Sequence, residues 1–448
     1  MEYKKKYNPD YRGYGPEMGR KAPLHRGITM DINKEHTSYS EDFISSYKNL
    51  VSSYMNITKK CEINPDCLSR EDLEKLLSDR ICSFENFVKV VFANQKELVS
   101  PRKVDISLAR IPKYYKEGRL PVKLLIGGVK SIKFNNIEIL GGSKNSRGFV
   151  LRDPVSESIA WKTINYSNSS LDHFLTFDVI SHLINKDILY EKLPKKHHAG
   201  RFVFFGGTTN HAHLIWEFLM RMPIIYDLFK EEEFKLAVTT DSKNLVERWF
   251  DLLGYPKDNL YFFDGDKVNS FEEITVITCP FGNFEPDWYS VYPESLFEIR
   301  RRALSHAKLY SSSRNKVYIS RMDASHRKMT NEPEFVHYLT EQGFDILNLS
   351  DMSLIDQIKK LSNASVVVSP VGAGSAMAMF APSDAVIAEI SDRSLFGGYN
   401  GPVSAVLLNQ NFHRIVTTDE GQHGNESLKE DFYGDLEQLK KLLNLYHI

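Results

Sequence analysis

Cysteine is scarce in this sequence. The 448 residues include four cysteines, at Cys61, Cys67, Cys82 and Cys279. A disulfide framework in a chain of this length would need many more of them, and neither a CxxC pair nor the Cys/His spacing of a zinc domain occurs. The sequence therefore predicts neither a disulfide-rich scaffold nor a cysteine-based zinc site.

The sequence also lacks long apolar runs and an excess of either charge. No stretch has the roughly 20 apolar residues that a membrane-spanning helix needs, and residues 1–21, rich in Lys and Tyr, lack the apolar core of a secretory signal. A formal net charge of −1 gives no case for nucleic-acid binding. We therefore expect a cytoplasmic protein without a nucleic-acid partner. The basic start leaves peripheral contact with the inner face of a membrane open, and the oligomeric state is not predicted.

The length exceeds what one hydrophobic core normally supports. Single cores rarely grow beyond about 250–300 residues, so 448 residues predict two domains and an extension. Residues 1–119 predict a loose tail followed by helices, among them Phe84–Leu98. Residues 120–292 and 293–448 each alternate strand and helix patterns. We expect an α/β protein in which an N-terminal, mainly helical extension precedes two Rossmann-like domains that face a cleft.

The first of these domains begins with short β segments and continues with βα units. Ser131–Phe134 and Ile137–Leu140 are separated by an Asn-Asn pair that predicts a turn between two strands. The strand predicted at Arg201–Phe205 ends in a double glycine, and Pro223 should end or kink the helix that follows. Further strands are predicted at Lys235–Thr240, Leu260–Phe263 and Ile274–Thr278, with a helix at Lys243–Leu253.

The stretch Lys316–Ile390 has the clearest pattern in the chain. Apolar runs of strand length alternate with segments of helical periodicity, which is typical of βαβ units on a parallel sheet. Gly343 stands where a helix C-terminus needs a residue that tolerates positive φ. The predicted strands are Lys316–Ser320, Phe344–Leu349, Ser365–Ser369 and Ala385–Ile390, and the predicted helices are Glu332–Gln342 and Ser353–Ala364.

A glycine-rich turn follows the third of these strands and leads into an apolar helix at Ala376–Phe380. Such a turn presents bare N–H groups and the positive end of a helix dipole, which suits a diphosphate. It is equally compatible with a tight βα connection. The residues of the turn are Gly372, Ala373, Gly374 and Ser375.

Charged residues surround this turn in the predicted sheet. Arg321 closes the first strand and Arg327 follows six residues later, so both lie at the carboxyl edge, where ligands of open α/β sheets bind. Arginine matches phosphate oxygens with paired donors. Glu389, near the end of the fourth strand, is placed to accept from ribose hydroxyls. Together these residues predict a nucleotide pocket.

The run "ISR…R…NE…L…GF…L…Q…A.VVVSP.GAG…MFAP…AEI" resembles the C-terminal half of glycosyltransferase family 61, and the resemblance extends over about Gly141–Thr418. The family commonly has His before the Gly-Ala-Gly and Asn after it, where this chain has Val371 and Met377. The departure bears on the identity of the donor more than on its class.

The resemblance implies a metal-independent, inverting glycosyltransferase of the GT-B arrangement. It would take a nucleotide sugar, expected to be a UDP-sugar, and a glycan or polysaccharide acceptor. No cofactor would be required, and a divalent metal is not expected. Arg321, Arg327 and the glycine turn would hold the diphosphate.

The segment that follows the double glycine is the predicted source of the base. His213 and Glu217 are four residues apart and so share one face of a helix. With Asn210 they resemble the family's N-terminal motif, and either of the two is a candidate base. Trp288, in the aromatic-rich segment Phe281–Tyr292, is predicted on an interdomain loop as an acceptor contact.

Alternatives remain open at the sequence level. His197, His198, His211 and His213 suggest a metal site. Asp264 and Asp266 follow an apolar run, as in glycosyltransferases that hold a divalent cation, although Asp-Gly-Asp is also an ordinary turn. A binding protein that has lost catalysis is a third class. The triplet Arg300-Arg301-Arg302 is predicted to be an exposed helix face.

Overall fold

The structure is a computed structural model. It describes residues 81–82, 91, 93–99, 102–106, 113–114, 118–119, 122–141, 149–156, 159–160, 194–278, 281–285, 288–307, 314–324, 328–391, 400–416 and 431–448. The predicted N-terminal tail and most of the predicted helical extension lie outside these residues. The described part is mixed α/β, as expected from the sequence.

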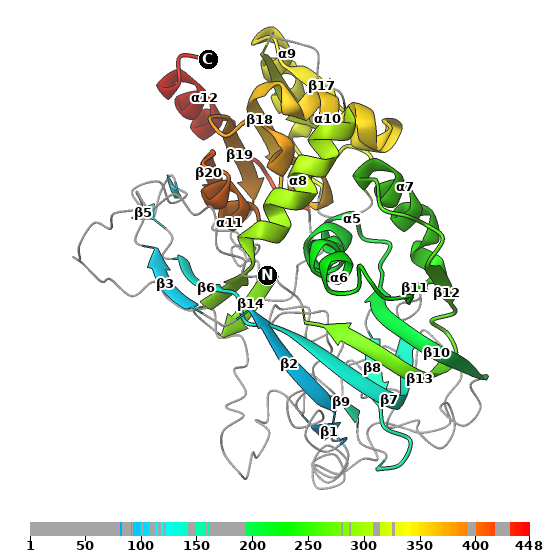
Figure 1. The fold of residues 1–448 in the computed structure, drawn as a ribbon. Helices are drawn as coiled ribbons and strands as arrows, with labels where there is room; N and C mark the ends of the chain where they lie inside the picture. The colour runs from blue at the N-terminus through cyan, green and yellow to red at the C-terminus, as the bar shows by residue number, and fades with distance from the viewer. Residues whose placement is uncertain are drawn as a thin grey trace, which may run out of the picture.

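The first sheet occupies the lower half of the molecule in Figure 1. Its strands are β1 (Ile81–Cys82), β2 (Asn94–Val99), β7 (Val129–Gly141), β8 (Phe149–Arg152), β9 (Ile159–Ala160), β10 (Lys195–Gly206), β11 (Lys235–Thr239), β12 (Leu260–Phe263) and β13 (Val268–Ile277). The order is β1-β9-β8-β7-β13-β10-β11-β12, with β2 beside β7. The run β13-β10-β11-β12 is parallel, whereas β7 pairs antiparallel with β13.

Two predictions for this half of the chain are wrong. The helix predicted at Phe84–Leu98 is a strand in its described part, because β2 pairs antiparallel with β7. Gln, Lys, Glu and Leu are good helix formers, but the ladder bonds of that pairing outweigh their intrinsic propensity. The two strands predicted around Asn135 form one strand, β7. It pairs with β13 on both sides of Asn136, which takes a left-handed φ of 52°, a conformation that asparagine tolerates.

Helical segments connect the parallel strands of the first sheet. They are α5 (His211–His213), the π-helix η3 (Leu214–Phe218), the 3-10 helices η4 (Leu219–Arg221) and η5 (Thr240–Ser242), α6 (Met222–Leu228) and α7 (Lys243–Leu253). From residue 211 to residue 228 the chain is helical throughout but changes pitch three times. Pro223 falls at the start of α6, where its missing N–H costs nothing, so the predicted break comes just before it.

A small sheet has the order β14-β15-β6-β3. Its strands are β3 (Arg102–Ile106), β6 (Val122–Ile126), β14 (Phe281–Glu285) and β15 (Trp288–Val291). The prediction of a loop at Phe281–Tyr292 is therefore wrong. It forms an antiparallel hairpin whose second strand pairs with β6.

The second sheet, in the upper half of Figure 1, contains the strands predicted in the stretch Lys316–Ile390. Its strands are β4 (Lys113–Tyr114), β5 (Gly118–Arg119), β16 (Asn315–Ile319), β17 (Asp345–Leu347), β18 (Ala364–Pro370), β19 (Val386–Ser391) and β20 (Asn411–Val416). The order is β17-β16-β18-β19-β20-β4-β5, and every pair except β4–β5 is parallel. The strand predictions for the stretch Lys316–Ile390 are confirmed to within two residues at each end.

Helices cover both faces of the second sheet. They are α8 (Pro293–Ala307), α9 (Glu332–Glu341), η6 (Leu349–Asp351), α10 (Leu354–Ser362), the 3-10 helix η7 (Ala373–Phe380), α11 (Asn400–Leu407) and α12 (Leu436–Leu445). Alternate strand residues face opposite layers: Val317 packs in one apolar cluster with α8 and α10, and Tyr318 packs in another with α9 and α12. Gly343 takes a φ of 75° after α9, as predicted.

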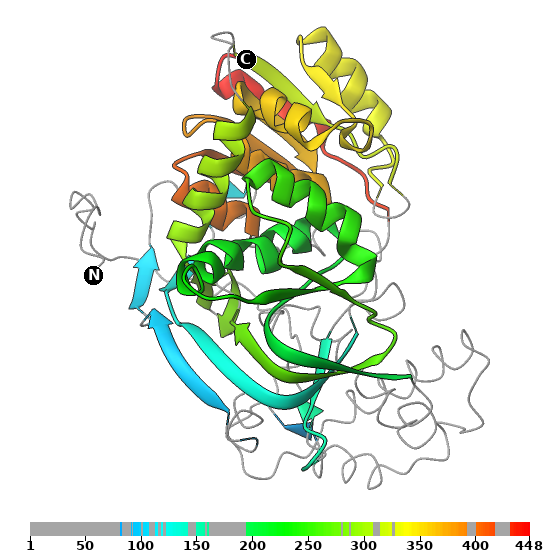
Figure 2. The ribbon, with the colours of Figure 1, turned by 45° about the vertical axis from the view of Figure 1, so that its right-hand side comes forward.

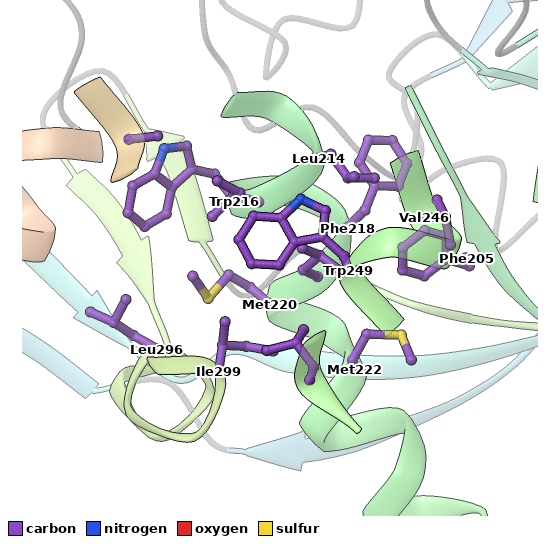
Figure 3. Packing of buried hydrophobic residues seen from close by; sticks show 14 of the residues in the cluster. Phe205, Leu214, Trp216, Phe218, Met220, Met222, Val246, Trp249, Leu296 and Ile299 are labelled. Carbon is purple, nitrogen blue, oxygen red and sulfur yellow. The ribbon is translucent and has the colours of Figure 1, made fainter. Parts of the chain in front are cut away.

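The two halves share one apolar cluster. Buried residues of the first sheet, of α7 and α8, and of one face of the second sheet all belong to it. Figure 3 shows Trp216, Phe218 and Trp249 in the same cluster as Leu296 and Ile299 of α8. In Figures 1 and 2, α7 and α8 lie between the two sheets. Shared packing on this scale fixes the halves against each other.

No helix among the described residues is long and apolar enough to cross a membrane.

Candidate active site

The second sheet reverses its strand order between β16 and β18. Counted along the chain, the parallel strands β16 to β20 lie in the order 2-1-3-4-5. In open α/β sheets, ligands bind outside the carboxyl ends of the strands at such a reversal. Arg321 follows the carboxyl end of β16, and the glycine turn follows that of β18. The topology therefore brings these two predicted features to one point.

The guanidinium of Arg321 lies against the backbone of Gly372. A Cβ atom placed on Gly372 would stand 1.9 Å from Arg321 Nη1 and 2.4 Å from its Cζ. Gly372 is extended, with φ of 164°, so backbone strain does not require glycine here. Glycine instead leaves room for a cationic side chain close to the backbone. Both residues are partly exposed, so a ligand can reach this contact from solvent.

The helix after the turn begins three residues before the predicted start at Ala376 and ends at Phe380, as predicted. It is a 3-10 helix that begins at Ala373, and Ser375 closes the turn by donating from N and from Oγ to the Gly372 carbonyl, at 3.2 and 2.8 Å. Its far end is fully buried, and Met377 is 0% exposed. The first amides of a helix have no partner within it, so the helix itself does not use the amides of Ala373 and Gly374.

Glu389 is committed to a buried ion pair. Its Oε1 accepts from Arg414 Nε at 2.9 Å and from Nη2 at 2.6 Å. The side chains of Glu389 and Arg414 are 5% and 1% exposed. A cation placed this deeply makes the pair part of the interior of the second sheet. Any ribose contact is left to Glu389 Oε2, near Gly401 at the start of α11.

His213 and Glu217 form a hydrogen-bonded pair, as their spacing predicts. His213 Nδ1 lies 2.5 Å from Glu217 Oε1, and the side chains are 23% and 8% exposed. Asn210 caps the helix by accepting from His213 N at 3.3 Å. When Nδ1–H donates to the carboxylate, Nε2 carries the lone pair. In that tautomer Glu217 orients the His213 ring through Nδ1.

Glu217 lies within the π-helix η3, where the chain holds one extra residue per turn. Arg221, fully buried, holds this irregular turn: its Nε donates to the Glu217 carbonyl at 3.0 Å and its Nη2 to the Phe205 carbonyl at 2.6 Å. A third donation reaches the Ile277 carbonyl at 3.5 Å. Phe205 and Ile277 stand at the carboxyl ends of β10 and β13, where the first sheet reverses its order. Arg221 was not predicted as a site residue, although its i+4 spacing from Glu217 is visible in the sequence.

The segment with His213 and Glu217 lies beside the helix that follows the glycine turn. Helix α5 contacts η7, and Trp249 of α7 joins them. Its Nε1 donates to His211 Nε2 at 3.1 Å, and its ring stacks on Phe380 with centroids 6.2 Å apart. Burial, with a smaller effect of the Arg248 cation, lowers the pKa of His211 to about 4. His211 is therefore a neutral packing residue next to the base segment.

The other histidines of the proposed metal site do not converge with His211 and His213. His197 is exposed on β10. His198 is buried, stacks on Phe271 and bonds through its two ring nitrogens to Tyr261 Oη at 2.8 Å and Asn269 Oδ1 at 2.9 Å. Within the described ranges, no group of three or more His, Cys, Asp and Glu side chains is placed to hold a metal.

The Asp-Gly-Asp segment forms the turn between β12 and β13. Asp264 Oδ1 accepts from Asp266 N at 3.0 Å, and its Oδ2 lies 3.2 Å from Lys267 Nζ. Its backbone carbonyl accepts from Asn269 Nδ2 at 2.8 Å. This is the local bonding of an Asx turn, with both Asp264 carboxylate oxygens engaged.

The arginine triplet on α8 has three different environments, so its prediction as one exposed face is wrong. Arg300 donates to the carbonyls of Met379 and Ala381, each at 2.9 Å, at the end of η7. Arg301 pairs with Glu298, and Arg302 pairs with it too and lies over the ring of Tyr255.

A hollow of about 400 Å³ runs along α8, lined by Phe297, Arg300, Arg301, Leu304 and Ser305. None of the predicted site residues lines it. Arg327 and the side chain of Trp288 lie outside the described part of the chain.

Residues 211–388 match the family model described as glycosyltransferase 61. The resemblance predicted from the sequence is confirmed over this narrower range, which indicates a glycosyltransferase. The match contains His213, Glu217, Arg321 and the glycine turn, while Asn210 and Glu389 fall one residue outside it. No curated protein matches the chain.

Proposed function

We propose that this protein, whose residues 211–388 belong to glycosyltransferase family 61, transfers a sugar from a nucleotide sugar to a glycan acceptor with inversion at the anomeric carbon. The observation that carries the proposal is the Arg321 guanidinium against Gly372, at the point where the second sheet reverses its order. A cation and the start of a helix meet there, and both favour a diphosphate.

The donor site is proposed at this point. Arg321 offers paired donors to the phosphate oxygens, and the amides of Ala373 and Gly374 supply further ones. A UDP-sugar is the proposed donor, with Glu389 Oε2 as the ribose contact and Arg327 as a second cation. The positive charge acts most strongly on the departing diphosphate, because negative charge develops there in the transition state.

The acceptor is activated by the pair in the first half. The acceptor hydroxyl gives its proton to His213 Nε2 while its oxygen bonds to the anomeric carbon. The bond from that carbon to the diphosphate oxygen breaks, and the nucleoside diphosphate leaves with the electron pair. Glu217 holds Nδ1–H and stabilises the imidazolium that forms. Asn210 and Trp288 are proposed to support the acceptor.

The two larger sheets would then belong to the two domains of a GT-B arrangement. The acceptor domain spans residues 120–292 and the donor domain residues 293–448 in this proposal. The contact between α5 and η7 supports it, because it brings the proposed base segment and the proposed diphosphate turn together.

Release of nucleoside diphosphate from a panel of nucleotide sugars, with acceptor glycans and with or without EDTA, tests the proposal. Release that survives EDTA is expected. Binding of a nucleotide sugar without release would instead support a non-catalytic binding protein. Release that EDTA abolishes would favour a metal-dependent enzyme that uses Asp264 and Asp266 or the histidines.

Matched variants locate the two roles. Arg321→Ala should weaken donor binding roughly 10- to 100-fold, because it removes charge-assisted hydrogen bonds. The control is Arg314, an exposed arginine that precedes β16 and pairs with Asp384. Arg314→Ala should leave donor binding unchanged. Glu217→Ala should bind donor normally and lose turnover. Full activity of that variant would remove Glu217 from the mechanism.

A further inference from the structure

A buried carboxylate lies behind Arg321. Glu332, the first residue of α9, is 1% exposed. A single oxygen of it, Oε1, collects three hydrogen bonds from the end of β16. The donors are Tyr318 Oη at 3.1 Å, Ser320 Oγ at 2.9 Å and Arg321 N at 2.7 Å.

These bonds fix the backbone on both sides of Arg321. Burial, and then the nearby Glu332 charge, raise the pKa of Tyr318 well above its ordinary value, so its hydroxyl stays a donor. Ser320 Oγ also accepts from Met322 N at 3.3 Å, which extends the restraint past Arg321. Hydrogen bonds to a carboxylate are roughly twice as strong as neutral ones. The turn after β16 is therefore held by the side chain of another element.

We infer that Glu332 is a positioning residue of the diphosphate site: it holds the backbone of Ser320 and Arg321 so that the Arg321 guanidinium lies over Gly372. A backbone that is already fixed has little conformational freedom left to lose when an anion binds, so the remaining ordering cost is that of the Arg321 side chain. Glu332 itself does not touch the ligand. The inference rests on the proposed function, since it assumes that an anion binds at Arg321.

The neighbouring residue supplies a matched control. Asn331 is 4% exposed and also bonds to backbone: its Nδ2 donates to the Gly434 carbonyl at 2.9 Å, and its Oδ1 accepts from Gly434 N at 2.7 Å. Asn331 thus secures the C-terminal segment and makes none of the bonds to β16. Loss of either side chain removes buried hydrogen bonds, but only the loss of Glu332 loosens Arg321.

Calorimetry of inorganic pyrophosphate with the full chain, in metal-free buffer, tests the inference. Glu332→Gln keeps the shape but not the charge, and it should raise the dissociation constant about tenfold. Asn331→Ala should lower the melting temperature and leave the dissociation constant within about twofold. Equal losses of affinity in both variants would overturn the inference, because general destabilisation would then explain them.

A double-mutant cycle adds a readout that a purely structural role would not move. In an Arg321→Ala background, Glu332→Gln should have almost no further effect on pyrophosphate affinity, because it acts through Arg321. Additive losses would overturn the positioning role. If Glu332→Gln does not fold, Ser320→Ala and Tyr318→Phe each remove one donor and keep the carboxylate. Each should weaken binding two- to threefold, and unchanged affinity in both would overturn the inference.

The outcomes separate this inference from the function on which it rests. A wild-type protein that binds no pyrophosphate would remove the anion site and Glu332's role with it. If the double-mutant cycle gives the expected result but no nucleotide sugar releases nucleoside diphosphate, the positioning role of Glu332 stands and the proposed sugar transfer is wrong. If the wild-type protein releases nucleoside diphosphate but Glu332→Gln binds pyrophosphate as tightly as wild type, only the positioning role of Glu332 is wrong.

Discussion

Two glycine turns follow two central strands of this molecule, and glycine serves a different purpose in each. After β10, Gly206 and Gly207 have φ of 80° and 135°, and a Cβ on Gly207 would lie 2.1 Å from Ser242 Oγ. After β18, Gly372 is extended, and a Cβ would meet Arg321 Nη1. The fold requires the first pair, whereas the second makes room for a cation. Sequence motifs of the same kind can therefore reflect either a crowded turn with positive φ or space for a charged side chain.

The carboxylates near the two turns differ in the same way. Glu217 pairs with a histidine that keeps 23% of its side chain exposed, and Glu389 pairs with an arginine that keeps 1%. An ion pair that solvent cannot reach contributes to the interior, and removing one partner is costly. The His213–Glu217 pair keeps part of its histidine in contact with solvent, whereas the Glu389–Arg414 pair does not.

The largest expected effect is on kcat, through His213 in the segment that follows the first glycine turn. His213→Ala should lower kcat by roughly 10²- to 10⁴-fold, the usual contribution of a general base, with little change in donor affinity. Steady-state kinetics measures both constants. His197→Ala, which alters an exposed histidine on β10, should leave kcat unchanged. A kcat of His213→Ala within about threefold of wild type would exclude His213 as the base.

Substitution of Gly207 should next reveal the packing role of the first turn. Gly207→Ala combines an unfavourable φ with overlap on Ser242 and should lower the free energy of unfolding by about 2–5 kcal/mol. Denaturant titration measures the loss. Gly200 has a positive φ of 99° but nothing within 4 Å of a Cβ, so Gly200→Ala isolates the backbone cost. Similar losses in the two variants would contradict a role for the Ser242 contact.

The neutral state of His211 should make stability depend on pH. Its pKa is about 4 when folded, against 6.5 in an unconstrained histidine. Between these values the unfolded chain binds the extra proton, so stability is complete above pH 6.5 and is lost as the pH falls toward 4. The loss attributable to His211 should be about 1–3 kcal/mol. Thermal unfolding of wild type and His211→Gln over this window should differ in slope, and parallel curves would exclude the effect.

The second turn should respond in binding rather than stability. Gly372→Ala must displace the Arg321 guanidinium, a movable side-chain end, and should weaken UDP binding about tenfold through the loss of a charge-assisted contact. Its melting temperature should stay near wild type. Calorimetry and thermal unfolding of one preparation measure both quantities. A destabilised variant with normal UDP affinity would make this turn resemble the first.

Gly374→Ala should have the smallest effect. A Cβ there would lie 3.1 Å from Ile319 Cγ2 and 3.4 Å from Leu349 Cδ1, contacts that a small adjustment relieves. UDP affinity should fall less than threefold and stability by less than about 1 kcal/mol. A loss as large as that of Gly372→Ala would mean that crowding in the turn, rather than Arg321, accounts for both results.

The sequence predicted the second half of the chain better than the first. In the stretch Lys316–Ile390, continuous apolar runs and helix signals agree with the sheet that forms, because helices cover both of its faces and its strands are therefore apolar on both sides. The segments Phe84–Leu98 and Phe281–Tyr292 carried no such signal. Pairing with β7 and β6 decided them, and pairing between distant strands leaves little trace in local propensity.

Spacing within one helix, and the order of strand, glycine and helix, were enough to find His213, Glu217 and the turn after β18. These features are local, so the sequence by itself determined them. The tertiary structure alone decided that Arg321 lies on Gly372, that Arg414 takes Glu389, and which carbonyls Arg221 binds. Those partners are joined by sheet register and by packing across many residues, and short-range hydrogen bonds and charges act only once the fold has brought them within a few ångströms.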